Sequence, residues 1–173
     1  QFARGKIVTA DNGMRVKLRR PLDFLAIADH GTSLGIFPRL MANDPALADW
    51  EVGKRWAKYM QEDNVATLIP EWALSLNSLN PKFQNTPKVR ASIWEHSVAT
   101  ADAHNEPGLF TAFAAYEWTS APEGNNLHRV VLYKDGADKV TQTLPFTAQD
   151  SPDPEELWSF FEDYERLTGG EVL

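Results

Sequence analysis

Short apolar runs alternate with amphipathic helical patterns along this chain, and that alternation restricts the folds it can adopt. Runs typical of strands cover residues 23–29, 110–117 and 127–134. Apolar residues recur at helical spacing over about residues 45–63, 87–105 and 154–168. Alternating strands and helices favour α/β layering over an all-β sandwich. We therefore expect an α/β fold, with residues 23–29 as a strand buried on both faces of a parallel sheet.

Turn and capping residues mark where these elements begin and end. Asp44 and Asp153 are placed to cap helices whose first residue is proline, and another helix opens at Thr86-Pro87. Dense turn chemistry at residues 120–126 predicts a hairpin between the two later strands. Residues 64–88, rich in Asn, Pro and Ser, predict an irregular excursion with a short helical turn near residues 70–72.

The two ends of the chain carry different signals. Residues 1–22 include a local basic stretch and are interpreted as a solvated lead-in to the first strand. Residues 171–173 resemble the start of a strand. The chain begins without an initiator Met or a signal-peptide pattern, so we expect it to be an internal piece of a longer protein.

Composition excludes several classes of function. The 173 residues, 43% hydrophobic, predict a single globular domain over 1–173, and the net charge of −7 argues against a nucleic-acid partner. No apolar run is long enough to span a membrane. Without Cys, any metal site must use His, Asp and Glu. No phosphate loop or dinucleotide fingerprint occurs.

Polar side chains close the first strand, where α/β enzymes carry out chemistry. Asp29 and His30 follow an apolar run directly, at the expected carboxyl end of a buried strand. Taken alone, the pair is equally typical of a helix cap or of side chains that bind loop backbone.

Two later residues favour a functional interpretation of that pair. Glu117 ends the second apolar run and His128 opens the third, so a hairpin would bring them together. The ends of the three strands should then place His30, Glu117 and His128 around one point. Two imidazoles and a carboxylate suit zinc, manganese or iron better than calcium. The remaining histidines, His96 and His104, are interpreted as structural.

Two neighbours of this group are candidates for substrate binding. Trp118 follows Glu117 and would line the mouth of the site. Arg129 could clamp an anion, although strand alternation directs it away from the face that carries His128.

Three segments carry a resemblance to a known family. They are "RPLDFLAIADH", "EPGLFTAFAAYEWTSAPEGNNLHRVVLYKDGAD" and "PEELW". In their residues and in their order along the chain, these segments resemble the bacterial domain-of-unknown-function family 3604. That family is similar to the polymerase and histidinol phosphatase (PHP) superfamily of metal-dependent phosphoesterases.

The resemblance implies a fold, a cofactor and residue roles. It implies part of a distorted (β/α)7 barrel, incomplete at both ends, in a protein that binds two or three divalent metals. His30 and His128 would be metal ligands, Glu117 a bridging ligand, and Asp29 a supporting residue behind them. His30 and Glu117 would be the catalytic residues. By the same resemblance, the superfamily's His-x-His motif would fall just before residue 1, and its later His and its Asp-x-His motif would fall after residue 173.

We therefore expect a fragment of a metal-dependent hydrolase that acts on a small phosphoester or related ester through metal-bound hydroxide. The alternatives are a binding or scaffold module without catalysis, and an amidase or lactonase with a similar metal centre. Because ligands are missing, the chain alone should bind metal weakly, be inactive and depend on the remainder of its polypeptide. Unpaired strand edges should make it associate. Export to the periplasm or outside the cell is favoured by the family resemblance only.

Overall fold

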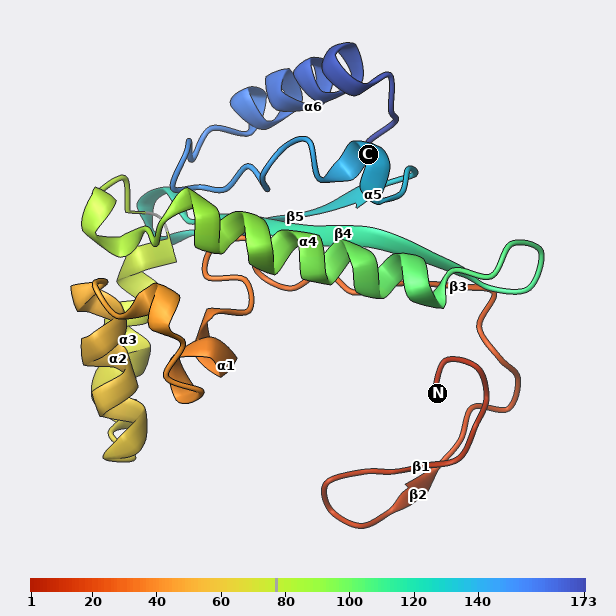
Figure 1. Ribbon diagram of the computed structural model, residues 1–173, viewed down its shortest axis with the longest axis horizontal. Coiled ribbons are helices and arrows are strands. Elements are labelled where there is room, and N and C mark those ends of the chain that lie inside the picture. Colours follow the sequence, from red (N-terminus) through yellow and green to blue (C-terminus); the bar gives the residue numbers. More distant parts are fainter. Residues whose placement is uncertain (77) are drawn as a thin grey trace.

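The computed structural model describes residues 1–76 and 78–173 and shows a mixed α/β chain (Figure 1). The strands found there are β1 (Val8–Thr9), β2 (Arg15–Val16), β3 (Phe24–Ala26), β4 (Thr111–Ser120) and β5 (Leu127–Tyr133). The α-helices are α1 (Ile36–Met41), α2 (Glu51–Gln61), α3 (Val65–Leu76), α4 (Pro87–His104), α5 (Ala137–Val140) and α6 (Pro154–Thr168). Short 3₁₀ helices cover Pro45–Leu47, Pro81–Phe83 and Pro122–Gly124.

The main sheet has three strands in the order β3-β4-β5. Strand β3 runs parallel to β4, with Leu25 opposite Ala112, and β5 runs antiparallel to β4, with Glu117 opposite Val130. The predicted hairpin is thus confirmed, with its turn at Pro122–Gly124. The expected strand start at residues 171–173 forms a single antiparallel bridge between Val172 and Tyr133.

The expected (β/α)7 barrel is wrong. Within the described residues the strands form one sheet of three and one of two, and no barrel closes. A barrel of this kind needs a helical crossover between successive parallel strands. Here the short turn at Pro122–Gly124 reverses the chain at once, so that β5 returns antiparallel to β4. The α/β expectation holds only in its coarser form, a mixture of helices and strands.

The two helices with the clearest caps begin where the sequence predicted. Thr86 Oγ1 accepts a hydrogen bond from the Val89 N–H at the start of α4, and Asp153 does the same for Glu155 at the start of α6. Asp44 also accepts from the Ala46 N–H, but it caps only the 3₁₀ turn Pro45–Leu47, and α2 begins later. Side-chain capping is therefore a good signal here for a helix start and a weaker one for helix length.

The prediction of an irregular excursion over 64–88 is wrong for its first half, because α3 occupies Val65–Leu76. Pro70 lies inside this helix, and proline normally disfavours a helix interior. Leu68 and Trp72, four residues apart, pack against the hydrophobic cluster formed with α1 and α2. Tertiary packing of this face outweighs the local penalty. Part of the predicted excursion, Asn77, lies outside the described residues.

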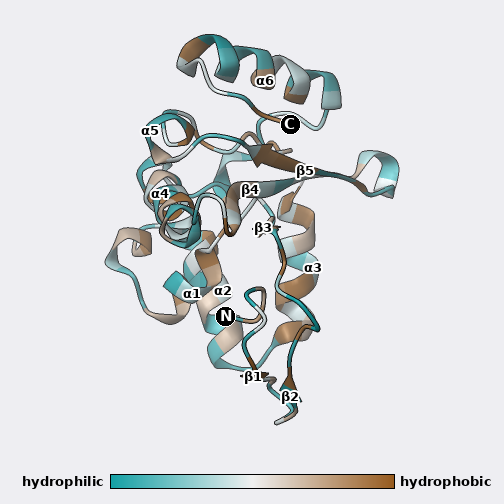
Figure 2. Ribbon diagram, turned by 90° about the vertical axis from the view of Figure 1, so that its right-hand side faces the viewer, coloured by the Kyte–Doolittle hydropathy of each residue, from teal (hydrophilic) through white to brown (hydrophobic). Residues whose placement is uncertain are grey.

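Two hydrophobic clusters hold the chain together. The first joins the sheet to α4, α5 and α6 through the fully buried side chains of Trp118, Tyr133 and Tyr164, among others. The second joins α1, α2, α3 and the start of α4 around Trp56. Leu34, in the loop between β3 and α1, packs against both clusters. Figure 2 shows α4, α5 and α6 on one side of the sheet and α3 on the other.

Strand β3 is not buried on both faces, contrary to the prediction. The side chain of Phe24 is 63% exposed, and Ile27, just after the strand, is also exposed. Strand β3 pairs with β4 on one side only and forms the edge of the sheet. Continuous apolar character was therefore an unreliable guide to burial in this strand.

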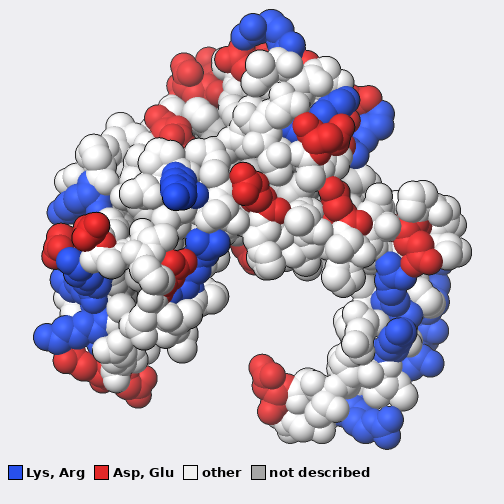
Figure 3. Space-filling model, viewed as in Figure 1, with Lys and Arg blue, Asp and Glu red and all other residues white. Residues whose placement is uncertain are grey.

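An arm formed by residues 1–22 extends away from the helices (Figure 1). It contains the β1–β2 ribbon, in which Val8 pairs with Val16, and Lys and Arg side chains gather along it (Figure 3). The predicted solvated segment thus contains a ribbon that the sequence analysis missed. A groove of about 440 Å³ lies between the arm, β3, β4 and α4. None of the described helices combines the length and apolar character that a membrane crossing requires.

Candidate functional site

Backbone hydrogen bonds place His30 beside Glu117. The Glu117 N–H donates to the Asp29 carbonyl, and the Gly31 N–H donates to the Glu117 carbonyl, both at 2.8 Å. This pair of bonds forms an isolated parallel bridge beyond the end of β3. The strand therefore delivers His30 to the middle of its neighbour β4.

Gly31 allows this close approach. A Cβ atom at this position would lie 2.7 Å from Tyr116 Cδ2 and 3.2 Å from the Glu117 carbonyl oxygen. Such a contact with Tyr116 is shorter than packed atoms tolerate, and Tyr116 is fully buried and unable to withdraw. The glycine after His30 is thus a steric requirement of the site.

The hairpin brings His128 to the same face. Thr119 lies opposite His128 in the β4–β5 register, two residues beyond Glu117 on β4. Side chains two apart on a strand share a face. Glu117, Thr119 and His128 therefore lie together on one face of the hairpin. The sequence predicted this arrangement for Glu117 and His128.

The three predicted side chains converge. His30 Nδ1 is 3.1 Å from Glu117 Oε2, and His128 Nδ1 is 3.4 Å from Glu117 Oε1. The side chains of His30, Glu117 and His128 are 33%, 23% and 46% exposed, so the group is open to solvent on one side. The predicted convergence is confirmed by these distances, while the roles of the residues stay predictions.

Thr119 completes the group and was missed in the sequence. Its hydroxyl donates to Glu117 Oε2 at 2.8 Å and lies 2.9 Å from His128 Nδ1. A hydroxyl has one proton to donate, so Thr119 accepts from an N–H at His128 Nδ1. In this network a neutral His128 carries its free lone pair on Nε2. Strand parity with Glu117 was the signal that could have identified Thr119.

His30 differs from His128 in its hydrogen bonding. Its Nδ1 is buried and has no hydrogen-bond partner among the described residues. The 3.1 Å between His30 Nδ1 and Glu117 Oε2 is short enough for a hydrogen bond. The angle at which the two groups meet, rather than their distance, is therefore unsuitable. The ring meets the edge of Trp72 from α3, with centroids 5.8 Å apart. Trp72 was also missed, because the sequence predicted only a short helical turn near residues 70–72 and not the longer helix α3.

The arrangement has the ligand types of a metal centre but not a preformed cage. In the part of the chain that the structure describes, no three His, Asp or Glu side chains are arranged to hold a metal ion. Instead, the imidazoles contact the carboxylate directly. The nitrogen–oxygen separations of 3.1 and 3.4 Å are nonetheless close to the roughly 3.4 Å between ligands in a tetrahedral site with bonds of about 2.1 Å.

Three other candidates lie away from this group. Trp118 is fully buried in the core on the opposite face of β4 and does not line the mouth of the site, contrary to the expectation. Arg129 also points away, as strand alternation predicted, and donates to the His128 carbonyl. Asp29 is exposed, lines the groove beside the arm, and contacts Glu117 only through its backbone carbonyl.

The remaining histidines lie on α4. His96 and His104 are exposed and line the same groove as Asp29. His104 Nδ1 is 2.8 Å from the Thr100 carbonyl one turn earlier. Neither has a contact with the group around Glu117 among the described residues.

The fold and this group define a mixed α/β chain with a His–Glu–His cluster on a strand face. The chain belongs to the family described as "Protein of unknown function (DUF3604)", whose model matches residues 1–173. Comparison with curated proteins and with solved structures gave no match.

Proposed function

We propose that this chain carries part of the divalent metal centre of a hydrolase that acts on phosphoesters or related esters. The observation that supports the proposal best is the buried, unpartnered Nδ1 of His30 beside a carboxylate that a second imidazole also approaches. Leaving a buried polar nitrogen without a partner costs free energy, which coordination of a cation would offset.

The types of residue in this group suit such a cation, although their side chains are not arranged as a metal cage among the described residues. His30, Glu117 and His128 would hold it, and a set of two imidazoles and one carboxylate suits zinc, manganese or iron. Once bound, the ion would supply a hydroxide-like nucleophile at neutral pH and stabilise negative charge that develops on the substrate. A relation between this family and the PHP phosphoesterases, which is part of the proposal, would imply the same class of chemistry.

The protein itself would orient the ligands. Thr119 holds the Glu117 carboxylate and fixes the His128 proton on Nδ1, which leaves Nε2 free to bind the ion. Paired backbone bonds around Glu117 and the edge of Trp72 restrain His30. Small movements of these side chains would complete the coordination.

Metal binding by the purified chain tests the proposal. We expect isothermal titration with Zn²⁺ and Mn²⁺ to show one saturable site whose affinity falls at least tenfold in Glu117→Gln and in His30→Ala. His104→Ala is the matched control, because it removes an imidazole outside the group and should bind as the wild type does. Equal affinities in Glu117→Gln, His104→Ala and the wild type would disprove the assignment.

A second measurement addresses the reaction. The natural protein that contains this sequence should hydrolyse members of a panel of phosphomonoesters and phosphodiesters once loaded with metal. Glu117→Gln should abolish that activity and Arg129→Ala should leave it unchanged. Hydrolysis that persists in Glu117→Gln would separate any activity from this group of residues.

A further inference from the structure

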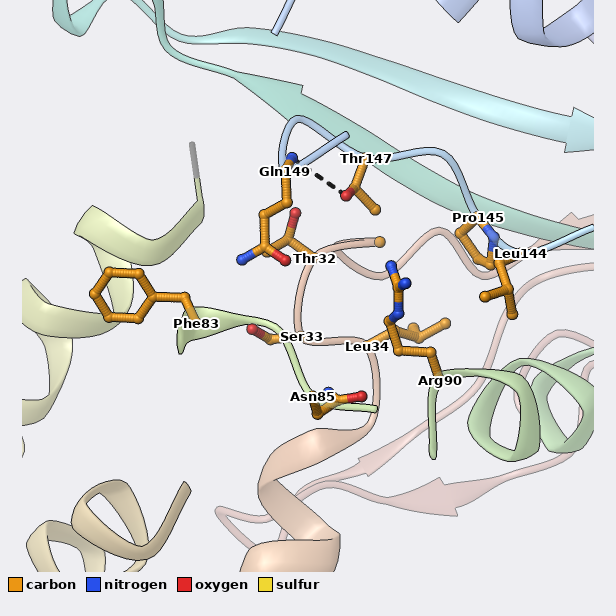
Figure 4. A pocket seen from close by; sticks show the side chains of 11 residues that line it. Thr32, Ser33, Leu34, Phe83, Asn85, Arg90, Leu144, Pro145, Thr147 and Gln149 are labelled. Atoms are coloured by element: carbon orange, nitrogen blue, oxygen red, sulfur yellow. Dashed lines mark hydrogen bonds between the residues drawn. The ribbon is translucent and has the colours of Figure 1, made fainter. Parts of the chain in front are cut away.

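A second pocket lies directly after His30 and is lined by three loops. The loops are residues 31–34 after β3, residues 83–90 leading into α4, and residues 144–149 between α5 and α6 (Figure 4). Its volume is about 30 Å³. A water molecule needs roughly 10–15 Å³ on this measure, so a group of a few heavy atoms fits.

The charge in this pocket is unbalanced. Arg90 extends from the start of α4 toward the 144–149 loop, as Figure 4 shows. Its Nε is buried without a hydrogen-bond partner, and among the described residues Arg90 forms no ion pair. Other partly buried arginines form ion pairs with acidic residues, as in Arg39–Asp44 and Arg55–Glu71. The described residues that line the pocket include no acidic residue.

An unpaired guanidinium in this position would be stabilised by a bound anion. Arginine stays protonated under all ordinary conditions, so it cannot escape the cost of burial by losing its charge. Its planar fork of N–H donors matches the oxygens of a carboxylate or phosphate. A bound oxyanion would therefore supply the partner that the protein does not.

Uncharged polar side chains, together with apolar ones, line the remainder of the pocket. Thr32, Thr147 and Gln149 are only 6%, 5% and 8% exposed, respectively. The backbone N–H groups of Thr32 and Ser33 donate no hydrogen bond within the described residues. Ser33 has a φ of +66°, which turns the loop sharply at this point. Free N–H groups in such a turn are typical of anion-binding concavities.

The third loop is held in place from outside the pocket. Tyr116 accepts a hydrogen bond from the Phe146 N–H at 3.1 Å, and burial keeps the pKa of its hydroxyl well above the ordinary value. Asp150 accepts from both the N–H and the hydroxyl of Thr147. The Asp150 carboxylate is thus engaged by its own loop, and the walls of the pocket are organised before any ligand arrives.

We propose that this pocket binds a small oxyanion, either free or as the phosphoryl, sulfuryl or carboxylate group of a larger ligand. Arg90 is its charged partner, and the 31–34 loop supplies N–H donors. The proposal is independent of the metal centre, since Arg90 lacks a partner whether or not a cation binds to Glu117.

Anion titrations of the wild-type chain, free of divalent metal, test the proposal. Inorganic phosphate, sulfate, acetate and chloride are added at constant ionic strength while ¹H–¹⁵N NMR spectra are recorded. We expect saturable shifts at Thr32, Ser33 and the Arg90 Nε–H with at least one oxyanion and none with chloride. Absence of saturable shifts, or shifts confined to the basic residues 15–20, would overturn the proposal.

Two charge-matched variants sharpen this test. Arg90→Gln should weaken oxyanion binding at least tenfold, because it removes the only cation among the described residues that line the pocket. Lys88→Gln removes the same charge from an exposed position on the same helix and should bind within about twofold of the wild type. Equal losses in the two variants would mean that net charge alone attracts the anion. If Arg90→Gln fails to fold, the wild-type titration decides the question.

Discussion

The two faces of strand β4 differ sharply, although their residues alternate along one segment of chain. On one face Tyr116 and Trp118 are completely buried and pack against α4 and α6 as part of the main core. On the other face Glu117 and Thr119 form a hydrogen-bonded group with His128. The first face is therefore devoted to packing and the second to polar contacts.

The contrast shows that a single strand can separate apolar packing from polar contacts. Because side chains alternate, neighbouring residues on β4 belong to different environments and should respond differently to substitution. The polar face also leaves apolar side chains partly uncovered, including Phe24 and Val130. We expect substitutions on the packed face to lower stability, and those on the polar face to alter ligand binding.

Removing a large side chain from the packed face should have the largest effect. Trp118→Ala should lower the free energy of unfolding by about 3–5 kcal/mol, because it leaves a cavity in the core. Its neighbour Glu117→Gln keeps the volume and should cost less than about 1 kcal/mol. Urea denaturation monitored by circular dichroism measures both. Similar losses in the two variants would contradict the separation of the faces.

Gly31 lies where the two faces meet, and it should tolerate no side chain. The Cβ in Gly31→Ala would approach both Tyr116 on the packed face and the Glu117 carbonyl. We expect a loss of about 1–3 kcal/mol from overpacking, together with a displaced His30. Thermal unfolding gives the first quantity, and the NMR signals of the His30 ring report the second. Unchanged stability would show that β3 and β4 are less tightly packed than the distances indicate.

The sequence predicted those parts of the molecule that depend on local signals. Thr86-Pro87 and Asp153-Pro154 located α4 and α6, and turn residues located the β4–β5 hairpin. The alternation of side chains along these strands then predicted that Glu117 and His128 lie together. Applied consistently, the same parity would have placed Trp118 in the core and added Thr119 to the site.

The parts that could not be predicted depend on contacts between distant segments. Pro70 suggested a break in the chain, but packing of Leu68 and Trp72 makes α3 a helix. The number and direction of strands depend on pairing, which apolar runs do not encode. The barrel expectation came from the family resemblance, and no local signal in the sequence could correct it. Arg90 had no distinguishing pattern, because only the structure shows that it lacks an acidic partner.

The hydrogen bonds of Thr119 offer a finer test of the polar face. Thr119→Val keeps the shape but removes the hydroxyl that links Glu117 to His128, and should cost about 1 kcal/mol. It should also weaken the preference of the His128 proton for Nδ1, since the nearer acceptor is lost and only Glu117 Oε1, 3.4 Å away, remains. Nitrogen NMR shifts of the imidazole report that change. Thr119→Ser, which retains the hydroxyl, should preserve the wild-type shifts, and a changed tautomer in that variant would count against the network.

The smallest expected effect concerns an ion pair below the polar face, where Arg55 of α2 contacts Glu71 of α3. The hydrogen bond from Arg55 lowers the pKa of Glu71 below its ordinary value of 4.5. A carboxyl group whose pKa is lower in the folded state stabilises the protein at higher pH. That stabilisation is complete above the ordinary pKa and is lost as the pH falls through the folded value.

Replacing the acid should therefore change stability in a pH-dependent way. Because the pair is partly exposed, we expect Glu71→Gln to cost only about 0.5 kcal/mol at pH 7, with the difference from the wild type shrinking below pH 4.5. Arg55→Gln and the double variant complete a mutant cycle, measured by urea denaturation at several pH values. A coupling energy of zero at pH 7 would show that the pair does not join α2 to α3. The support beneath Trp72 and His30 would then come from apolar packing alone.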